Sequence, residues 1–245
     1  MKRRHAVRLL GASLLGAIFL LGGHHEREAA PPPTPPGPHQ TAYWEGTIER
    51  FERRDAESAP RPGSVLFIGS SSVRMWKTLA RDMEPLAVIN RGFGGSEIRH
   101  STHFADRIVA PYEPRGIVLY AGDNDMARHR DRGPEQVLED VKAFVAAAEQ
   151  AELRAPIYFV SIKPSLARMQ HWPRMAEANR LVRELAEQHP RLRYLDVATP
   201  MLGPDGKPRP ELFVEDGLHL NGEGYALWTR VIQPVLLDEL GAPAS

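Results

Sequence analysis

The chain of 245 residues contains no cysteine. This absence excludes disulfide bonds, thiolate metal sites and a cysteine nucleophile. An excess of charge is also missing, because 31 Lys and Arg residues balance 31 Asp and Glu residues. Nucleic-acid binders need a basic excess to neutralise phosphates, so we expect no nucleic-acid partner.

Long hydrophobic runs are equally scarce. The uncharged stretch near the start covers residues 9–23, which is shorter than the roughly 20 residues of a membrane helix. Basic residues precede it, as in secretory signals. We therefore expect residues 1–23 to be a signal peptide and the protein to be periplasmic or secreted. The alternative is a retained anchor that tethers the protein to the membrane.

Proline dominates residues 31–38, where it favours extended backbone without hydrogen-bond donors. We interpret residues 24–40 as a Pro-rich linker and residues 41–245 as one globular domain. With 42% hydrophobic and 25% charged residues, the composition is that of an ordinary folded protein.

The domain alternates predicted strands and helices. Short apolar runs predict buried parallel strands, at residues 65–68, 87–90, 116–120, 157–160 and 192–196. Helical spacing and Pro at first turns predict helices, at residues 43–53, 134–151, 173–188 and 223–240. This order predicts a three-layer α/β/α sandwich around a five-stranded, mostly parallel sheet. Ligands should then bind at the carboxyl ends of the strands.

Polar clusters follow the first two of these strands. Gly69-Ser70-Ser71-Ser72 follows the first strand, where a serine on a strand-to-helix turn could act as a nucleophile or simply cap the helix. The glycine-rich residues 90–96 follow the second strand and could offer backbone N–H groups to a ligand or form a tight turn. They do not match the dinucleotide-binding pattern of glycines.

Two further clusters complete the pattern. Gly122-Asp123-Asn124-Asp125 follows the third strand, and its Asn side chain could donate an N–H or take part in a polar turn. Asp216 and His219 precede the last helix. Their three-residue spacing lets the carboxylate hold the imidazole ring. By itself, such a pair is more often structural than catalytic.

Together, the order and spacing of the four clusters resemble those of the SGNH (GDSL-like) hydrolase family over about residues 41–241. The resemblance implies a flavodoxin-like fold and hydrolysis of esters without a cofactor or metal. It makes Ser71 the matching nucleophile, with His219 as its base and Asp216 behind the histidine. It also implies an oxyanion hole built from Ser71, Gly95 and Asn124.

The chain departs from the family pattern at two positions. Ser70 stands where the family has Asp, and Asp123 stands where it has Thr. Neither position is catalytic in the family. We expect the extra carboxylate of Asp123 to alter the charge of the pocket and hence the choice of substrate.

Other side chains have competing interpretations. His100 and His103 could bind a metal, although surface positions are the more common outcome. Trp76 is expected in the core, and Trp172 could line the substrate pocket. Three arginines could recognise an anionic substrate group, namely Arg74, Arg91 and Arg99.

Three functions are compatible with this sequence. The first is a serine esterase or acylhydrolase acting on small acyl esters, such as acetylated carbohydrate or a lipid-like ester. The second is an O-acyltransferase that uses the same triad to acylate carbohydrate. The third is a non-catalytic carbohydrate-binding relative, which would have no need of all five matching residues.

Overall fold

The computed structural model of the chain describes residues 38–129 and 132–241. The predicted signal peptide or anchor at residues 1–23, and the predicted linker up to residue 37, lie outside the described residues. Within the described ranges, no helix combines the length and the apolar character needed to span a membrane.

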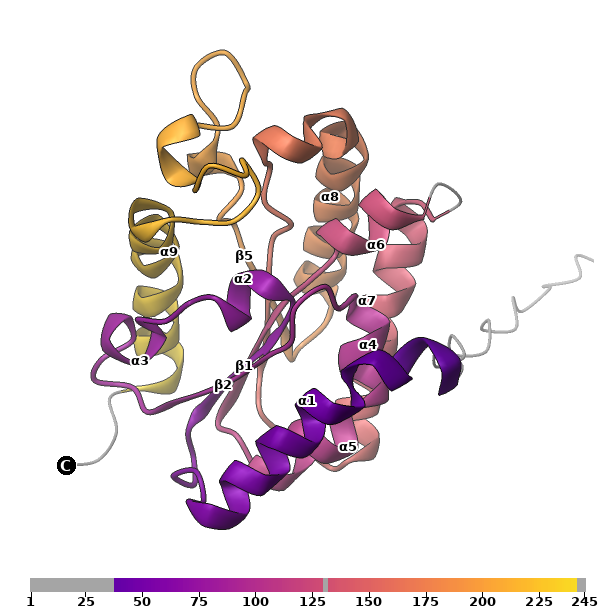
Figure 1. Ribbon diagram of the computed structural model, residues 1–245, viewed down its shortest axis with the longest axis vertical. Helices are drawn as coiled ribbons and strands as arrows, with labels where there is room; N and C mark the ends of the chain where they lie inside the picture. Colours follow the sequence, from indigo (N-terminus) through magenta and orange to yellow (C-terminus); the bar gives the residue numbers. More distant parts are fainter. Residues whose placement is uncertain (1–37, 130–131, 242–245) are drawn as a thin grey trace, which may run out of the picture. The chain divides into compact units, whose positions relative to one another are not determined.

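Helices and strands alternate along the chain (Figure 1). The strands are β1 (Val65–Gly69), β2 (Val88–Gly92), β3 (Gly116–Tyr120), β4 (Ile157–Val160) and β5 (Leu192–Leu195). The α-helices are α1 (Pro38–Glu57), α2 (Ser71–Arg74), α3 (Leu79–Asp82), α4 (Ile98–His103), α5 (Ala105–Ile108), α6 (Asp123–Arg128), α7 (Pro134–Gln150), α8 (Trp172–Gln188) and α9 (Gly222–Leu240). Short 3₁₀ helices are η1 (Ala110–Tyr112), η2 (Leu166–His171), η3 (Thr199–Met201) and η4 (Pro210–Leu212).

The five strands form one sheet in the order β2-β1-β3-β4-β5, and every neighbouring pair is parallel. This order is that of flavodoxin-like folds, in which the chain changes direction across the sheet between β1 and β3. The carboxyl ends of β1 and β3 are in register, with Gly69 opposite Tyr120. A ligand site is therefore expected beside these two ends.

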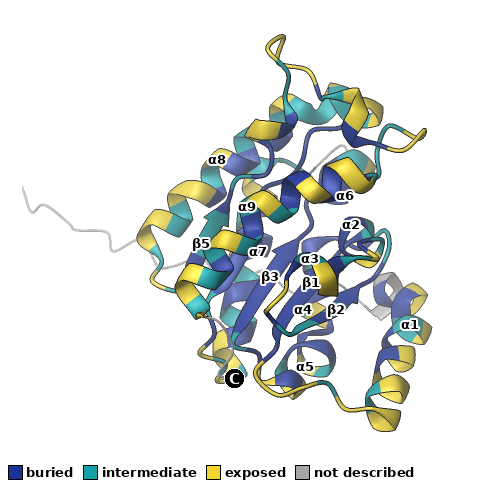
Figure 2. Ribbon diagram, turned by 90° about the vertical axis from the view of Figure 1, so that its left-hand side faces the viewer, coloured by how far each residue is buried: buried dark blue, intermediate teal, exposed yellow. Residues whose placement is uncertain are grey.

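Alternate strand residues enter two separate cores, because successive side chains point to opposite faces of a sheet. Leu66 and Ile68 of β1 pack with residues of α1, α4, α5, α7 and α8. Val65 and Phe67 pack with residues of α2, α3 and α9 on the opposite face. In Figure 2 the central strands β1 and β3 are dark blue between these two helical layers, β5 at one edge of the sheet is partly teal, and the outer surfaces of the helices carry exposed residues.

The predicted three-layer fold is therefore confirmed. All five predicted strands are present, with ends that differ by no more than two residues from the observed ones. The first helix is longer than expected, from Pro38 to Glu57 instead of residues 43–53. The helix expected directly after the first strand is α2. The short helices α3 to α6 were not predicted, because a helix of one or two turns has no repeating apolar pattern.

Candidate active site

Ser71 is the first residue of α2 and lies two residues after the end of β1. The turn depends on Gly69, which has a φ of 135° and whose Cβ, if present, would lie 1.9 Å from the carbonyl oxygen of Tyr120. Ser70 and Ser72 are buried on either side of it. Of these three serines, Ser71 is the one whose hydroxyl contacts His219, with 3.0 Å between Oγ and Nε2.

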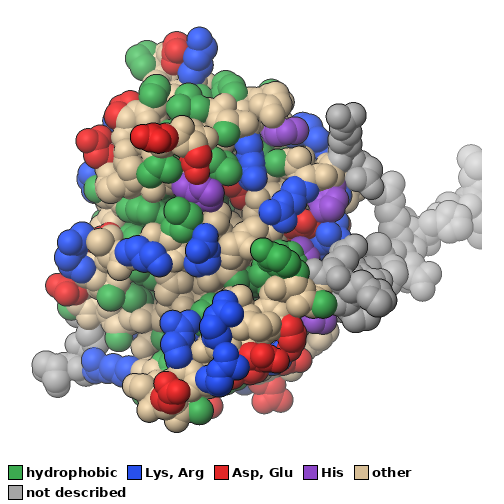
Figure 3. All heavy atoms as spheres, in the orientation of Figure 1, with side chains coloured by type: hydrophobic (Ala, Val, Ile, Leu, Met, Phe, Trp, Pro, Cys, Tyr) green, Lys and Arg blue, Asp and Glu red, His purple; other side chains and the backbone are tan. Residues whose placement is uncertain are grey.

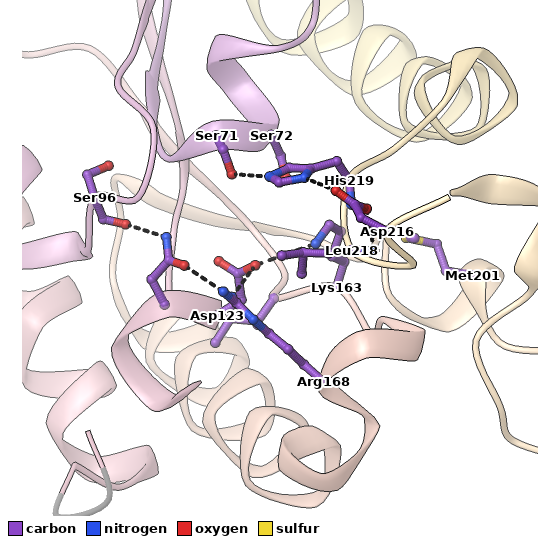
Figure 4. A network of polar contacts seen from close by, with 12 residues as sticks. Ser71, Ser72, Ser96, Asp123, Lys163, Arg168, Met201, Asp216, Leu218 and His219 are labelled. Carbon is purple, nitrogen blue, oxygen red and sulfur yellow. Dashed lines mark hydrogen bonds and ion pairs between the residues drawn. The ribbon is translucent and has the colours of Figure 1, made fainter. Parts of the chain in front are cut away.

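His219 is held by the loop that precedes α9. Its Nδ1 lies 2.6 Å from Asp216 Oδ2, while Asp216 Oδ1 accepts hydrogen bonds from the backbone N–H groups of Leu218 and His219 at 2.8 Å each. Partial burial raises the pKa of Asp216, but these hydrogen bonds outweigh it and lower that pKa to about 2. An ionised Asp216 requires Nδ1 to carry the proton, which leaves Nε2 to accept the hydrogen bond from the Ser71 hydroxyl. Figure 4 shows the His219 ring between Asp216 and Ser71, with a dashed line to each.

Hydrogen-bond donors lie near Ser71 on two other loops. Gly95 follows β2 with a φ of 76°, a conformation that glycine adopts without strain. Within the described part of the chain, neither the Ser71 N–H nor the Gly95 N–H donates a hydrogen bond. Asn124, in α6 after β3, uses one of its two amide hydrogens for the Ser96 carbonyl oxygen at 2.9 Å. One amide hydrogen and two backbone N–H groups thus remain for a ligand.

An ionic cluster of Asp123, Lys163 and Arg168 (Figure 4) contacts Asn124 through Arg168. Arg168 donates to Asn124 Oδ1 at 3.0 Å and lies 3.1 Å from the carboxylate of Asp123. The Lys163 ammonium lies 3.4 Å from the same carboxylate, and its side chain is 1% exposed. Burial raises the pKa of Asp123, but the charges of Lys163 and Arg168 outweigh burial and lower it. The contact from Arg168 fixes the orientation of the Asn124 amide.

A pocket of about 760 Å³ opens beside Ser71 and His219. Gly94, Gly95 and Asn124 form one part of its wall, and Leu218 lies next to the histidine. Residues of α1 form another part of the wall, and they are Tyr43, Trp44, Thr47 and Arg50. The sequence-predicted residues Ser71, Gly95, Asn124 and His219 therefore all line one pocket, with Asp216 hydrogen-bonded to His219.

Residues 63–227 match the model of the GDSL-like lipase/acylhydrolase family. This match covers more than half of the chain. The chain belongs to this family. It is thus an ester-hydrolysing enzyme, and the predicted family resemblance is confirmed.

Solved structures share the fold of this GDSL-like protein. A candidate acylhydrolase from Bacteroides fragilis has a TM-score of 0.68 and 20% identity, covering 80% of this chain and 98% of its own. A GDSL-like lipase from Bacteroides thetaiotaomicron has a TM-score of 0.66 and 19% identity, covering 78% and 97%. A catalytic mutant of an acetylxylan esterase from Geobacillus stearothermophilus has a TM-score of 0.58 and 17% identity, covering 74% and 95%. No curated protein compared with the chain matches it.

Two expectations about individual side chains, Asp123 and Trp172, need correction, and one, Trp76, is confirmed. Asp123 does not add an unbalanced charge to the pocket, because Lys163 and Arg168 pair with it. Trp172 is absent from the pocket wall and packs against the core instead. Trp76 is buried in the core on the α9 side, as predicted.

The two candidate histidines do not form a metal centre. His100 is buried with its ring centroid 4.1 Å from that of Trp44, and its Nδ1 accepts a hydrogen bond from the Glu97 N–H. Burial lowers the pKa of His100 to about 4, against the opposing effect of Glu97. His103 packs edge-on against Phe104. Across residues 38–129 and 132–241, no group of three or more metal-ligating side chains occurs.

Of the three candidate arginines, Arg74 lines the pocket. Arg91 is buried and pairs with Asp55, while Arg99 pairs with Glu97 at 2.8 Å. Sequence reasoning missed Lys163 and Arg168. Lys163 comes three residues after the end of β4, so the rule that ligands gather at strand ends could have found it, whereas Arg168 lies in η2, which has no such signal.

Proposed function

We propose that this GDSL-like protein is a serine esterase that hydrolyses small acyl esters through an acyl-enzyme formed on Ser71. The observation that carries the proposal is the pair of hydrogen bonds from Asp216 through His219 to Ser71, beside a pocket large enough for a small ester. This arrangement provides a nucleophile, a base and a group that orients the base.

In the first half of the reaction, Ser71 Oγ forms a bond to the acyl carbon while His219 Nε2 takes the hydroxyl proton. His219 then gives this proton to the leaving alcohol oxygen as the ester C–O bond breaks. Asp216 keeps Nδ1 protonated and stabilises the positive charge that the ring carries between these steps.

Negative charge develops on the carbonyl oxygen during the attack. The donors proposed to receive it are the N–H groups of Ser71 and Gly95 and the free amide hydrogen of Asn124. One donor of this kind typically contributes about 3 kcal/mol to transition-state stabilisation. Arg168 supports this role. Its N–H group donates to Asn124 Oδ1, and this contact would be lost if the amide turned over and placed its nitrogen there.

The second half of the reaction releases the acid. A water molecule gives a proton to His219 and attacks the acyl carbon, and the bond to Ser71 Oγ breaks as the proton returns to Ser71. Delivery of the acyl group to a sugar hydroxyl would make the enzyme an acyltransferase. We favour water as the acceptor because the family is one of acylhydrolases.

The wall of the pocket supports a short acyl group. It is built largely from Arg, Ser, Thr, Asn and His side chains and from glycine backbone. A long fatty acyl chain needs a continuous apolar lining to gain from leaving water. Acetyl esters, including those on carbohydrate, therefore fit better. An acetylxylan esterase is among the proteins that share this fold.

Release of para-nitrophenol from its acetate tests the proposal. We expect the wild-type protein to hydrolyse this ester and Ser71→Ala to lose activity by about 10³-fold or more, because the nucleophile is removed. Ser70→Ala is the matched control, since the neighbouring hydroxyl is buried and makes no contact with His219. Equal activity of Ser71→Ala and wild type would reject the nucleophile, and faster transfer to added xylose than to water would identify an acyltransferase.

A further inference from the structure

The pocket beside Ser71 is strongly basic. Four arginines line it, and no Asp or Glu residue does so among the described residues. They are Arg50, Arg74, Arg128 and Arg168. Lys and Arg side chains are also frequent across the middle of the face shown in Figure 3. The pocket is therefore a local concentration of positive charge on a chain whose total charge is zero.

Three of these arginines have no carboxylate partner in the described part of the chain, and they are Arg50, Arg74 and Arg128. Arg168 differs from them, because it has a carboxylate partner in Asp123. Outside the pocket, some arginines have close carboxylate partners, as in the contacts of Arg107 with Glu45 and Glu52, whereas others, such as Arg54 and Arg115, donate to backbone carbonyl oxygens. Like charges gathered without partners repel one another, and a bound anion would relieve that repulsion.

Two of the unpaired guanidinium groups pack directly on the glycine loop. A Cβ on Gly94 would lie 2.7 Å from Arg74 Nε, and one on Gly95 would lie 2.8 Å from Arg128 Nη2. Arg128 also donates to the Gly95 carbonyl oxygen at 2.7 Å. The missing side chains of these glycines thus make room for both arginines beside the proposed oxyanion donor.

The third unpaired arginine, Arg50, comes from α1, which lies outside the residues that match the family model. The helix is firmly attached next to the pocket. Trp44 donates from its indole nitrogen to the Gly94 carbonyl oxygen at 2.9 Å, and Ile48 is fully buried in the core. Arg50 itself donates to Thr47, another residue of the pocket wall, at 2.7 Å. The helix therefore adds an exposed cation to the pocket wall.

We propose that the substrate is an ester that carries a carboxylate or phosphate group close to the scissile bond, and that Arg50, Arg74 and Arg128 bind this anion. The proposal rests on the function proposed above and specifies its substrate class. Guanidinium groups suit both anions, because their planar N–H donors match two oxygens at once. The anion would fix the substrate so that its carbonyl oxygen faces Gly95 and Asn124.

Matched pairs of esters test the proposal. The mono-para-nitrophenyl ester of succinate, compared with para-nitrophenyl butyrate, places a carboxylate on the acyl side. Para-acetoxybenzoate, compared with its methyl ester, places the carboxylate on the alcohol side of the ester. Para-acetoxyphenyl phosphate carries a phosphate in place of that carboxylate. The quantity measured is the ratio of kcat/KM for the anionic ester to kcat/KM for its neutral partner, in the wild-type protein and in each variant.

We expect a ratio above one for at least one anionic ester, and a reduction of about tenfold in each of R50Q, R74Q and R128Q, the effect of removing one charge-assisted hydrogen bond. The matched control is R53Q, because Arg53 lies on the same helix, is exposed, and pairs with Glu49 away from the pocket. Its ratio should stay at the wild-type value. Added salt should lower the wild-type ratio, since ions screen exposed charges.

Two results would overturn the proposal in distinguishable ways. If wild type cleaves neutral esters through Ser71 but the ratio is the same in R50Q, R74Q, R128Q and R53Q, the anion site is wrong and the esterase proposal stands. If neither neutral nor anionic esters are cleaved, or if Ser71→Ala cleaves them as fast as wild type, the proposed function fails and the substrate class fails with it.

Discussion

At the scale of single residues, the Asp216 carboxylate can orient the His219 ring and stabilise its positive charge only while the carboxylate is ionised. The hydrogen bonds from Leu218 and His219 lower the pKa of Asp216 to about 2 despite its partial burial. Asp216 is then ionised at every pH at which an ester assay is practical. The orientation of the His219 ring, with Nε2 toward Ser71, should therefore be constant across such an assay.

Among the residues near the active site, Lys163 is the one whose loss we expect to lower the free energy of unfolding most. Lys163→Met leaves the buried carboxylate of Asp123 with Arg168 as its remaining ionic partner. We expect the free energy of unfolding to fall by about 3 kcal/mol, as when one partner of a buried ion pair is removed. Urea unfolding measures this change.

The control for this measurement is Lys142→Met, which removes an exposed lysine from a surface pair with Glu139. Its effect should stay within about 0.5 kcal/mol. A loss in Lys163→Met no larger than in Lys142→Met would contradict the ionic role assigned to the buried lysine.

Single residues also show why part of the site could be predicted and part could not. Ser71, Gly95, Asn124 and His219 lie in short motifs directly after strands or before a helix, so local order located them. Arg91 was a candidate for recognition of an anionic substrate group. Its side chain instead points to Asp55, which is 36 positions away in the sequence, and such a distant partner leaves no local pattern.

At the scale of elements, α1 is attached to the rest of the fold through the buried side chains of Trp44, Ile48 and Phe51 as well as through ion pairs. The ring of Trp44 lies over His100, and its indole N–H reaches the glycine loop. Strands could be predicted from their apolar runs, but the docking of α1 could not, because it depends on contacts with residues about 50 positions away.

Trp44→Ala tests this attachment. We expect the free energy of unfolding to fall by about 3 kcal/mol, the lower end for removal of a buried aromatic side chain. Limited proteolysis should then cut first within α1. Tyr43→Ala is the matched control, because this neighbour is 82% exposed and its loss should change stability by at most about 0.5 kcal/mol. Equal effects of the two substitutions would contradict the role of Trp44.

At the scale of the whole molecule, a buried carboxyl group links folding to pH. Burial, together with the charges of Glu97 and Asp140, raises the pKa of Asp125 to about 8. Burial also raises the pKa of Asp140, to about 6. The folded state therefore holds these protons at a pH where the unfolded chain, with carboxyl pKa values of about 4, has released them. Stability should be greatest in mild acid and should fall as pH rises toward 8.

Asp125→Asn tests this linkage, because the amide resembles the protonated acid and keeps an oxygen for the Ile98 N–H. Between pH 7 and 8, above the range in which the buried His100 adds a slope of opposite sign, Asp125 is the main source of the slope, and wild type should lose up to about 1.4 kcal/mol per pH unit while the variant should lose much less. Urea unfolding across this range measures both slopes. The exposed Asp106→Asn serves as control, and equal slopes in Asp125→Asn and wild type would contradict the account.

The central claim is that Ser71, and neither of its neighbours Ser70 and Ser72, forms a covalent bond to the substrate. Treatment with a fluorophosphonate, followed by mass spectrometry of the peptides, tests it most directly because the reagent is attacked by an activated serine hydroxyl. The account predicts a single adduct on Ser71, lost in Ser71→Ala and strongly reduced in His219→Ala. An adduct on Ser70 or Ser72, or labelling that is unaffected by loss of His219, would contradict it.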